Sequence, residues 1–137
     1  MLSFIRKHKL PERMFNTFNI GAHLIFNFFP QRKVFIDGRA EFYGPDFFNR
    51  YIQIIEGNES ALQQAIEKYN LDGFIMCYYA DAPAPVIKYI NGKGFKCVYF
   101  GWDGIIFVSN NFIEKNPSLA NFIVDFSSVE VLSLIHI

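Results

Sequence analysis

Three charged residues that follow a short apolar run could together perform chemistry. Residues 33–44 read KVFIDGRAEFYG, so Asp37, Arg39 and Glu41 alternate just after a predicted strand. A carboxylate there can act as a general base or bind a metal ion, and an arginine can hold an anion. Open α/β sheets bind ligands at the carboxyl ends of their strands. This stretch is therefore the first candidate for an active site.

A structural interpretation of the same residues stays open beside the catalytic one. Asp37 can accept hydrogen bonds from backbone N–H groups of the turn and can pair with Arg39, while Gly38 permits the tight bend. Glu41 lies on a predicted loop without a partner at a defined spacing. Two hypotheses follow: a turn that closes on itself, or a self-contained α/β enzyme, such as a hydrolase or nuclease-like protein, that uses Asp37, Arg39 and Glu41.

Aromatic residues give a third hypothesis, a stand-alone binding module for a glycan or a peptide. Trp102 and Asp103 stand at the tip of a predicted hairpin, where an exposed tryptophan could contact a partner or a membrane surface. Packing of Trp102 over the sheet edge is the alternative. Tyr43, Tyr78 and Tyr79 could line a groove for a sugar or a lipid head group, or they could fill the core.

No metal site and no cofactor site is expected from the sequence. The patterns GxSxG, GxxxxGK[ST] and GxGxxG are absent. His23 has no histidine, glutamate or cysteine partner at metal-binding spacing, and Cys77 and Cys97 form no CxxC pair. The two cysteines are expected to be reduced core residues. A disulfide between them would require neighbouring strands and an oxidising compartment.

Composition indicates one packed domain and argues against a nucleic-acid partner. The chain has 137 residues, and its 51% hydrophobic content is enough for a core. Its net charge of zero lacks the basic footprint expected of a nucleic-acid-binding protein. The basic cluster at residues 6–9 is interpreted as a solvated helix face. The longest apolar run, residues 20–29, is too short to span a membrane.

The pattern of apolar residues predicts helices that alternate with strands. This alternation indicates an α/β layered domain with a mostly parallel central sheet and helices packed on the sheet. The continuous apolar run at 74–79 favours a strand buried on both faces of such a sheet. Asp103-Gly104 predicts an antiparallel edge hairpin near 95–109. Helices are expected at 2–8, 22–29, 45–56, 59–69, 83–90 and 117–126, strands at 14–18, 33–37, 74–79, 95–100 and 105–109, and a turn at 19–21.

The domain prediction divides the chain into three parts. Residues 1–110 are expected to form one soluble α/β domain, and residues 111–131 to begin a truncated C-terminal extension. The last six residues, LSLIHI at 132–137, look like the in-frame translation of a transposon-based sequencing adaptor. They are expected to be an artefact, so His136 is not considered as a ligand.

Three segments, taken in order, carry a resemblance to a known family. They read LPERMFNTFNIGAHLIFNFFPQRKVFIDGRAEFYG, ALQQAIEKYNLDGFIM and GFKCVYFGWDGIIFVSN. Together they resemble the soluble C-terminal domain of large bacterial multispanning membrane proteins that are similar to polyprenyl-phosphate-sugar-dependent glycosyltransferases. The resemblance covers about residues 2–110, and its most distinctive string is FN…G…L…P…VFIDGR…YG. The matching positions are Asn16, Gly21, Asp37, Gly38, Arg39, Tyr43 and Gly44.

The resemblance implies a location outside the bacterial cell membrane, attached to a membrane-embedded part of the same parent chain. It also implies a glycan or a lipid-linked sugar as a further partner. It gives no catalytic role to the matching positions, because the acidic catalytic residues implied for such enzymes lie on loops between membrane helices. The leading hypothesis is therefore a non-catalytic accessory domain of a membrane-embedded glycosyltransferase-like protein.

Overall fold

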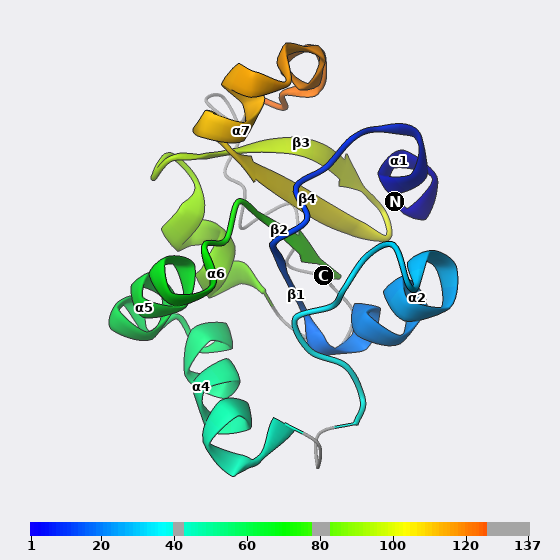
Figure 1. The fold of residues 1–137 in the computed structure, drawn as a ribbon. Coiled ribbons are helices and arrows are strands. Elements are labelled where there is room, and N and C mark those ends of the chain that lie inside the picture. The colour runs from blue at the N-terminus through cyan, green and yellow to red at the C-terminus, as the bar shows by residue number, and fades with distance from the viewer. Residues whose placement is uncertain (40–42, 78–82, 126–137) are drawn as a thin grey trace.

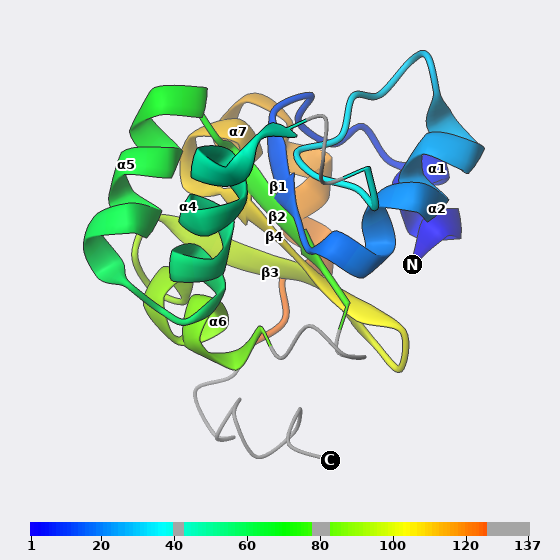
Figure 2. The ribbon, with the colours of Figure 1, turned by 90° about the horizontal axis from the view of Figure 1, so that it is seen from below.

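A four-stranded sheet with the strand order β1-β2-β4-β3 separates the helices into two groups (Figures 1 and 2). The computed structural model describes residues 1–39, 43–77 and 83–125. The predictions for Glu41, Tyr78 and Tyr79 and for residues 132–137 fall outside these residues. The elements are α1 (Leu2–Lys7), β1 (Met14–Asn16), α2 (Phe18–Phe28), α4 (Pro45–Ile55), α5 (Glu59–Tyr69), β2 (Gly73–Met76), α6 (Ala84–Ile90), β3 (Phe95–Gly101), β4 (Gly104–Ser109), α7 (Asn110–Lys115) and the 3₁₀ helix η1 (Pro117–Phe122).

The sheet is mixed and mostly antiparallel, so the prediction of a mostly parallel sheet is wrong. Strands β1 and β2 are parallel, with Phe15 opposite Phe74, whereas β4 runs antiparallel to both β2 and β3. All residues of β2 are buried because helices cover both faces of the sheet. A continuous apolar run indicates that a strand is buried on both faces. It does not indicate whether the neighbouring strands run parallel or antiparallel to it. The predicted antiparallel edge hairpin is confirmed by β3 and β4.

Two apolar clusters, one on each face of the sheet, form the core. Along β4, Ile105 and Phe107 belong to the first cluster, while Ile106 and Val108 belong to the second. This alternation is the period of two that a strand imposes on its side chains. The first cluster draws its helical residues from α4, α5 and α6, and the second from α1, α2, α7 and η1. The prediction that helices pack on the sheet is therefore confirmed for both faces.

The segment after Asn110 packs on the same sheet. Ile113 of α7 and Leu119 of η1 are buried in the second cluster. The backbone N–H of Val124 donates to the carbonyl oxygen of Cys97 at 2.8 Å. The described part of the predicted C-terminal extension thus contributes to the core around β3.

Residues 33–37 form an irregular segment with a bend at Phe35 and not the predicted strand. Strand β1 is the edge of the sheet, and its backbone pairs with β2 alone. The backbone of Phe35 and Ile36, next to β1, forms hydrogen bonds with the side chain of Asn16. These bonds replace the backbone hydrogen bonds that a further strand would make with β1. The predicted turn at 19–21 is also wrong, because these residues lie inside α2, where Ile20 and Gly21 are buried.

The two cysteines do not meet the condition for a disulfide. Cys97 lies on β3 and Cys77 directly follows β2, and β4 separates these two strands. Neither cysteine forms a disulfide. Burial raises the pKa of the Cys97 thiol to about 12, so this residue behaves as a small apolar core side chain at neutral pH.

Candidate functional site

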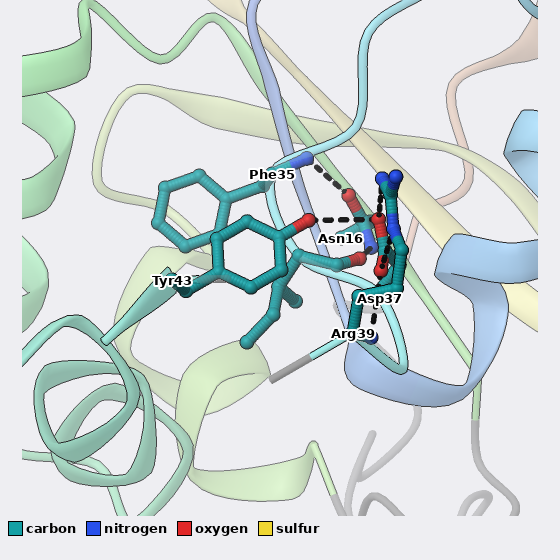
Figure 3. A network of polar contacts seen from close by, with 6 residues as sticks. Asn16, Phe35, Asp37, Arg39 and Tyr43 are labelled. Carbon is teal, nitrogen blue, oxygen red and sulfur yellow. Dashed lines mark hydrogen bonds and ion pairs between the residues drawn. The ribbon is translucent and has the colours of Figure 1, made fainter. Parts of the chain in front are cut away.

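The side-chain amide of Asn16 fixes the segment that leads to Asp37. Asn16 ends β1 and is buried. Its Nδ2 donates to the carbonyl oxygens of Ile36 and Thr17 at 2.8 and 2.9 Å, and its Oδ1 accepts from the N–H of Phe35 at 2.7 Å (Figure 3). Toward residues 35 and 36 the amide makes one donor bond and one acceptor bond, as a paired strand residue would, and its second donor bond goes to Thr17. It therefore satisfies backbone groups at the free edge of β1.

Helix α2 approaches the same segment from the other side through Gly21. A Cβ atom at this position would collide with the carbonyl oxygen of Ile36, and it would lie 2.9 Å from the Cα atom of Asp37. Only a residue without a side chain allows this approach of helix and backbone. Asn16 and Gly21 together determine where the chain turns at Asp37.

The carboxylate of Asp37 is buried and accepts four hydrogen bonds (Figure 3). Its residue is 2% exposed. The backbone N–H and Nε of Arg39 donate to Oδ1 at 2.8 and 2.9 Å, and Nη2 of Arg39 donates to Oδ2 at 2.6 Å. The hydroxyl of Tyr43 donates to Oδ2 at 2.7 Å. Asp37 and Arg39 thus form the self-closing turn that the structural interpretation predicts.

These hydrogen bonds set the protonation state of the site. The side-chain hydrogen bonds from Arg39 hold the pKa of Asp37 well below its ordinary value, against the opposing effect of burial. Asp37 in turn raises the pKa of Arg39, so this guanidinium stays charged. Burial, and then the hydrogen bond to Asp37, raises the pKa of Tyr43. A general base works best with a pKa near the operating pH, and the pKa of Asp37 is displaced away from that range.

We expect Asp37→Asn to lower the free energy of unfolding by about 2 kcal/mol at neutral pH, because the amide replaces a buried acceptor of charge-assisted hydrogen bonds. The folded-state pKa of Asp37 lies below its ordinary value of 3.8. Its ionised form therefore adds stability in full above that value, and this stability is lost as the pH falls toward the folded-state pKa. Urea unfolding at neutral pH and at about pH 3 should show the difference between wild type and variant shrinking in acid. An equal difference at both pH values would contradict this assignment.

The other aromatic candidates lie in different surroundings. The ring of Tyr43 stacks on Phe47, with ring centroids 5.2 Å apart, and packs against the first core cluster. Trp102 is 80% exposed at the turn between β3 and β4. Its neighbour Asp103 accepts hydrogen bonds from the hydroxyl of Tyr99 at 2.8 Å and from the amino group of Met1 at 2.6 Å. The network around Asp37 thus contains Tyr43 but neither Trp102 nor Asp103.

Two features of the structure were not predicted from the sequence. A hollow of about 450 Å³ lies between α4 and α5, with Phe47 and Tyr69 in its wall and Arg50 and Lys68 among its polar lining. The position of Gly21 against Ile36 is the second feature. The aromatic residues of α4 are a signal for an apolar helix face, but no local pattern shows that Gly21 meets a segment 15 residues further along.

The described part of the chain contains no group of three or more His, Cys, Asp or Glu side chains placed to hold a metal ion. Among the same residues, no helix is both long enough and apolar enough to cross a membrane. Comparison of the chain with protein-family models, with curated proteins and with solved structures found no match.

Proposed function

We propose that this chain is a non-catalytic accessory domain of a membrane-embedded glycosyltransferase-like protein, placed on the extracytoplasmic side of the bacterial cell membrane. The observation that supports this most is the saturation of the Asp37 carboxylate, which accepts all four of its hydrogen bonds from Arg39 and Tyr43. Asp37, the acidic residue in the most distinctive string of the sequence, therefore stabilises the turn. Sugar transfer is assigned to the membrane part of the parent protein.

Five of the seven positions that carry the family resemblance meet around the backbone of Ile36 and Asp37. Asn16 binds the backbone of Ile36, Gly21 makes room for the same backbone, and Asp37 binds Arg39 and Tyr43. These contacts support the interpretation that the string FN…G…L…P…VFIDGR…YG maintains the shape of this turn. In the proposed function this shape presents a rigid corner that docks on loops of the membrane part and helps to form an acceptor site.

The hypothesis of a self-contained enzyme has less support. It requires Asp37, Arg39 and Glu41 to converge on a pocket where substrate can reach them. Asp37 is buried, and Arg39 is turned onto it as a bidentate partner. The lowered pKa of Asp37 also makes it a weak proton acceptor at neutral pH.

The hypothesis of a glycan- or peptide-binding module that displays Tyr43 and Trp102 loses support at Tyr43. The hydroxyl of Tyr43 is engaged by Asp37, and its ring packs on Phe47. Trp102 keeps a free indole surface. Chemical-shift mapping with cell-wall glycans tests this alternative. A module of this kind requires the resonances of Trp102 to shift when a glycan is added, and unchanged Trp102 resonances would contradict it.

Sugar transfer by the intact parent protein in membranes tests the proposal. We expect Arg39→Gln to leave the rate per folded molecule nearly unchanged, whereas deletion of the domain lowers the rate or changes the choice of acceptor. Removing a catalytic group that stabilises a transition-state charge would instead cost about a hundredfold in rate or more. A loss of that size in Arg39→Gln, or unchanged transfer after deletion, would contradict the accessory role.

The coding sequence upstream of Met1 provides an independent check. The proposal requires a series of hydrophobic membrane-spanning segments of about 20 residues each in the same reading frame. A stop codon in that frame directly upstream would remove the membrane part and overturn the proposal.

A further inference from the structure

Helix α2 presents an aromatic face that no described element covers. Its sequence, FNIGAHLIFNF, contains no charged residue. Ile20 and Leu24 point into the second core cluster. On the other side Phe26 is 89% exposed, and Phe29, at the end of the helix, is 70% exposed. An exposed face of a surface helix normally carries polar and charged side chains, so two exposed phenylalanines three residues apart require an explanation.

Trp102 extends this face across the end of the sheet. A hollow of about 510 Å³ is lined by Trp102 from the β3–β4 turn together with Asn19 and His23 of α2. His23 is exposed and lies one helical turn before Phe26. We call His23, Phe26, Phe29 and Trp102 the aromatic face. It contains the most exposed large apolar side chains of the described residues.

The charge of the chain is divided along the sequence, although its sum is zero. Residues 1–36 contain six of the 13 Lys and Arg residues and one of the 13 Asp and Glu residues, which gives a net charge of +5. The remaining residues contain seven basic and twelve acidic side chains, a net charge of −5. The segment that includes α1 and α2 is therefore strongly basic. Such asymmetry points to an anionic surface as its partner.

A basic side chain of α1 contacts α2, the helix that carries Phe26. Helices α1 and α2 lie side by side (Figures 1 and 2). Nη2 of Arg6 is 3.3 Å from Oδ1 of Asn27 on α2, and the guanidinium of Arg6 lies 5.6 Å from the ring centroid of Phe28. Lys7 and Lys9 are exposed next to Arg6, and Lys33 is exposed just beyond Phe29.

We propose that the aromatic face and the basic residues around it bind the surface of an anionic lipid bilayer. Exposed phenylalanine and tryptophan rings partition into the interface between lipid head groups and acyl chains, and lysine and arginine side chains attract anionic head groups. The acidic remainder of the chain is repelled by the same surface, which orients the domain with α1 and α2 toward the lipid. This inference rests on the surface of the chain itself and goes beyond the proposed accessory role.

Binding of the purified chain to lipid vesicles tests this inference directly. The probes are vesicles of phosphatidylcholine alone and vesicles in which about one third of the lipid is phosphatidylglycerol. We expect co-sedimentation with the anionic vesicles at low salt, at least fivefold weaker binding to neutral vesicles, and a loss of binding at high salt. Trp102 is the single tryptophan of the chain, so its fluorescence should shift to shorter wavelength when anionic vesicles are added.

Two double variants separate the contribution of the exposed phenylalanines from that of the lysines. Phe26→Ser with Phe29→Ser should reduce binding at least fivefold, and Lys7→Gln with Lys9→Gln should reduce it and flatten its salt dependence. Ile52→Ser and Lys88→Gln are matched changes at exposed positions on α4 and α6, and they should bind like the wild type. Circular dichroism confirms the fold of each variant. Equal binding to both vesicle types, unchanged binding of the phenylalanine variant, or binding to duplex DNA in place of vesicles would overturn the inference.

Discussion

Replacing Asn16 with aspartate is expected to lower the free energy of unfolding by about 3–4 kcal/mol at neutral pH. The new carboxylate can still accept from the N–H of Phe35, but it cannot donate to the carbonyl oxygens of Ile36 and Thr17. Each buried group left without its hydrogen-bond partner costs about 1–3 kcal/mol, and the charge adds its own desolvation penalty. Urea unfolding followed by circular dichroism measures the change.

Asn49→Asp is the matched control for this substitution, because Asn49 is exposed on α4 and its change is expected to stay within about 0.5 kcal/mol. Acid provides a second test. Burial raises the folded-state pKa of an aspartate at position 16, so protonation should occur first in the folded protein and the deficit should shrink as the pH falls. A deficit below about 1 kcal/mol at neutral pH would show that the amide of Asn16 does not hold the segment.

Replacing Gly21 with alanine is expected to lower the free energy of unfolding by about 2–3 kcal/mol, since overpacking against backbone forces the neighbouring chain to move. The sign is the informative part. In an unobstructed helix interior, the change from glycine to alanine stabilises by about 1 kcal/mol. At Gly21 the added Cβ atom meets the carbonyl oxygen of Ile36, which belongs to backbone and cannot rotate away. Thermal and urea unfolding both report this change.

Gly38→Ala is the control in the same turn. A Cβ atom at Gly38 would have no heavy atom within 4 Å, and its backbone does not require a positive φ. Its effect should stay within about 0.5 kcal/mol. If Gly21→Ala proved neutral or stabilising, α2 would not press on the backbone at Ile36, and the two-sided support of the Asp37 turn would be wrong.

Elements with local signals could be predicted from the sequence. The side chain of Asn58 accepts a hydrogen bond from the N–H of Ala61 at 2.9 Å and so caps the N-terminus of α5. Pro45 occupies the first turn of α4. The two residues between β3 and β4 form the predicted hairpin turn, which includes Asp103. The pairing of Asp37 with Arg39 could also be predicted, because the two residues are only two positions apart.

Elements that depend on distant parts of the chain could not be predicted. The run Val34-Phe35-Ile36 has the composition of a strand, but whether it pairs depends on what lies at the edge of β1. There the side chain of Asn16, 20 residues before Ile36, provides the hydrogen bond. The direction of the strands next to β2 could not be predicted either. A strand buried on both faces has the same continuous apolar sequence in a parallel and in an antiparallel sheet.

The ionisation of Asp37 tests most directly whether this turn is a structural unit. A ¹³C NMR titration of the Asp37 side-chain carboxyl carbon reports its protonation, and the same carbon in the urea-unfolded chain is the reference. We predict that the carboxylate of the folded protein stays ionised well below the pH at which the unfolded reference takes up its proton, because Arg39 and Tyr43 bind the charged form. A folded-state titration at or above the reference pH would contradict this and would restore Asp37 as a candidate for proton transfer.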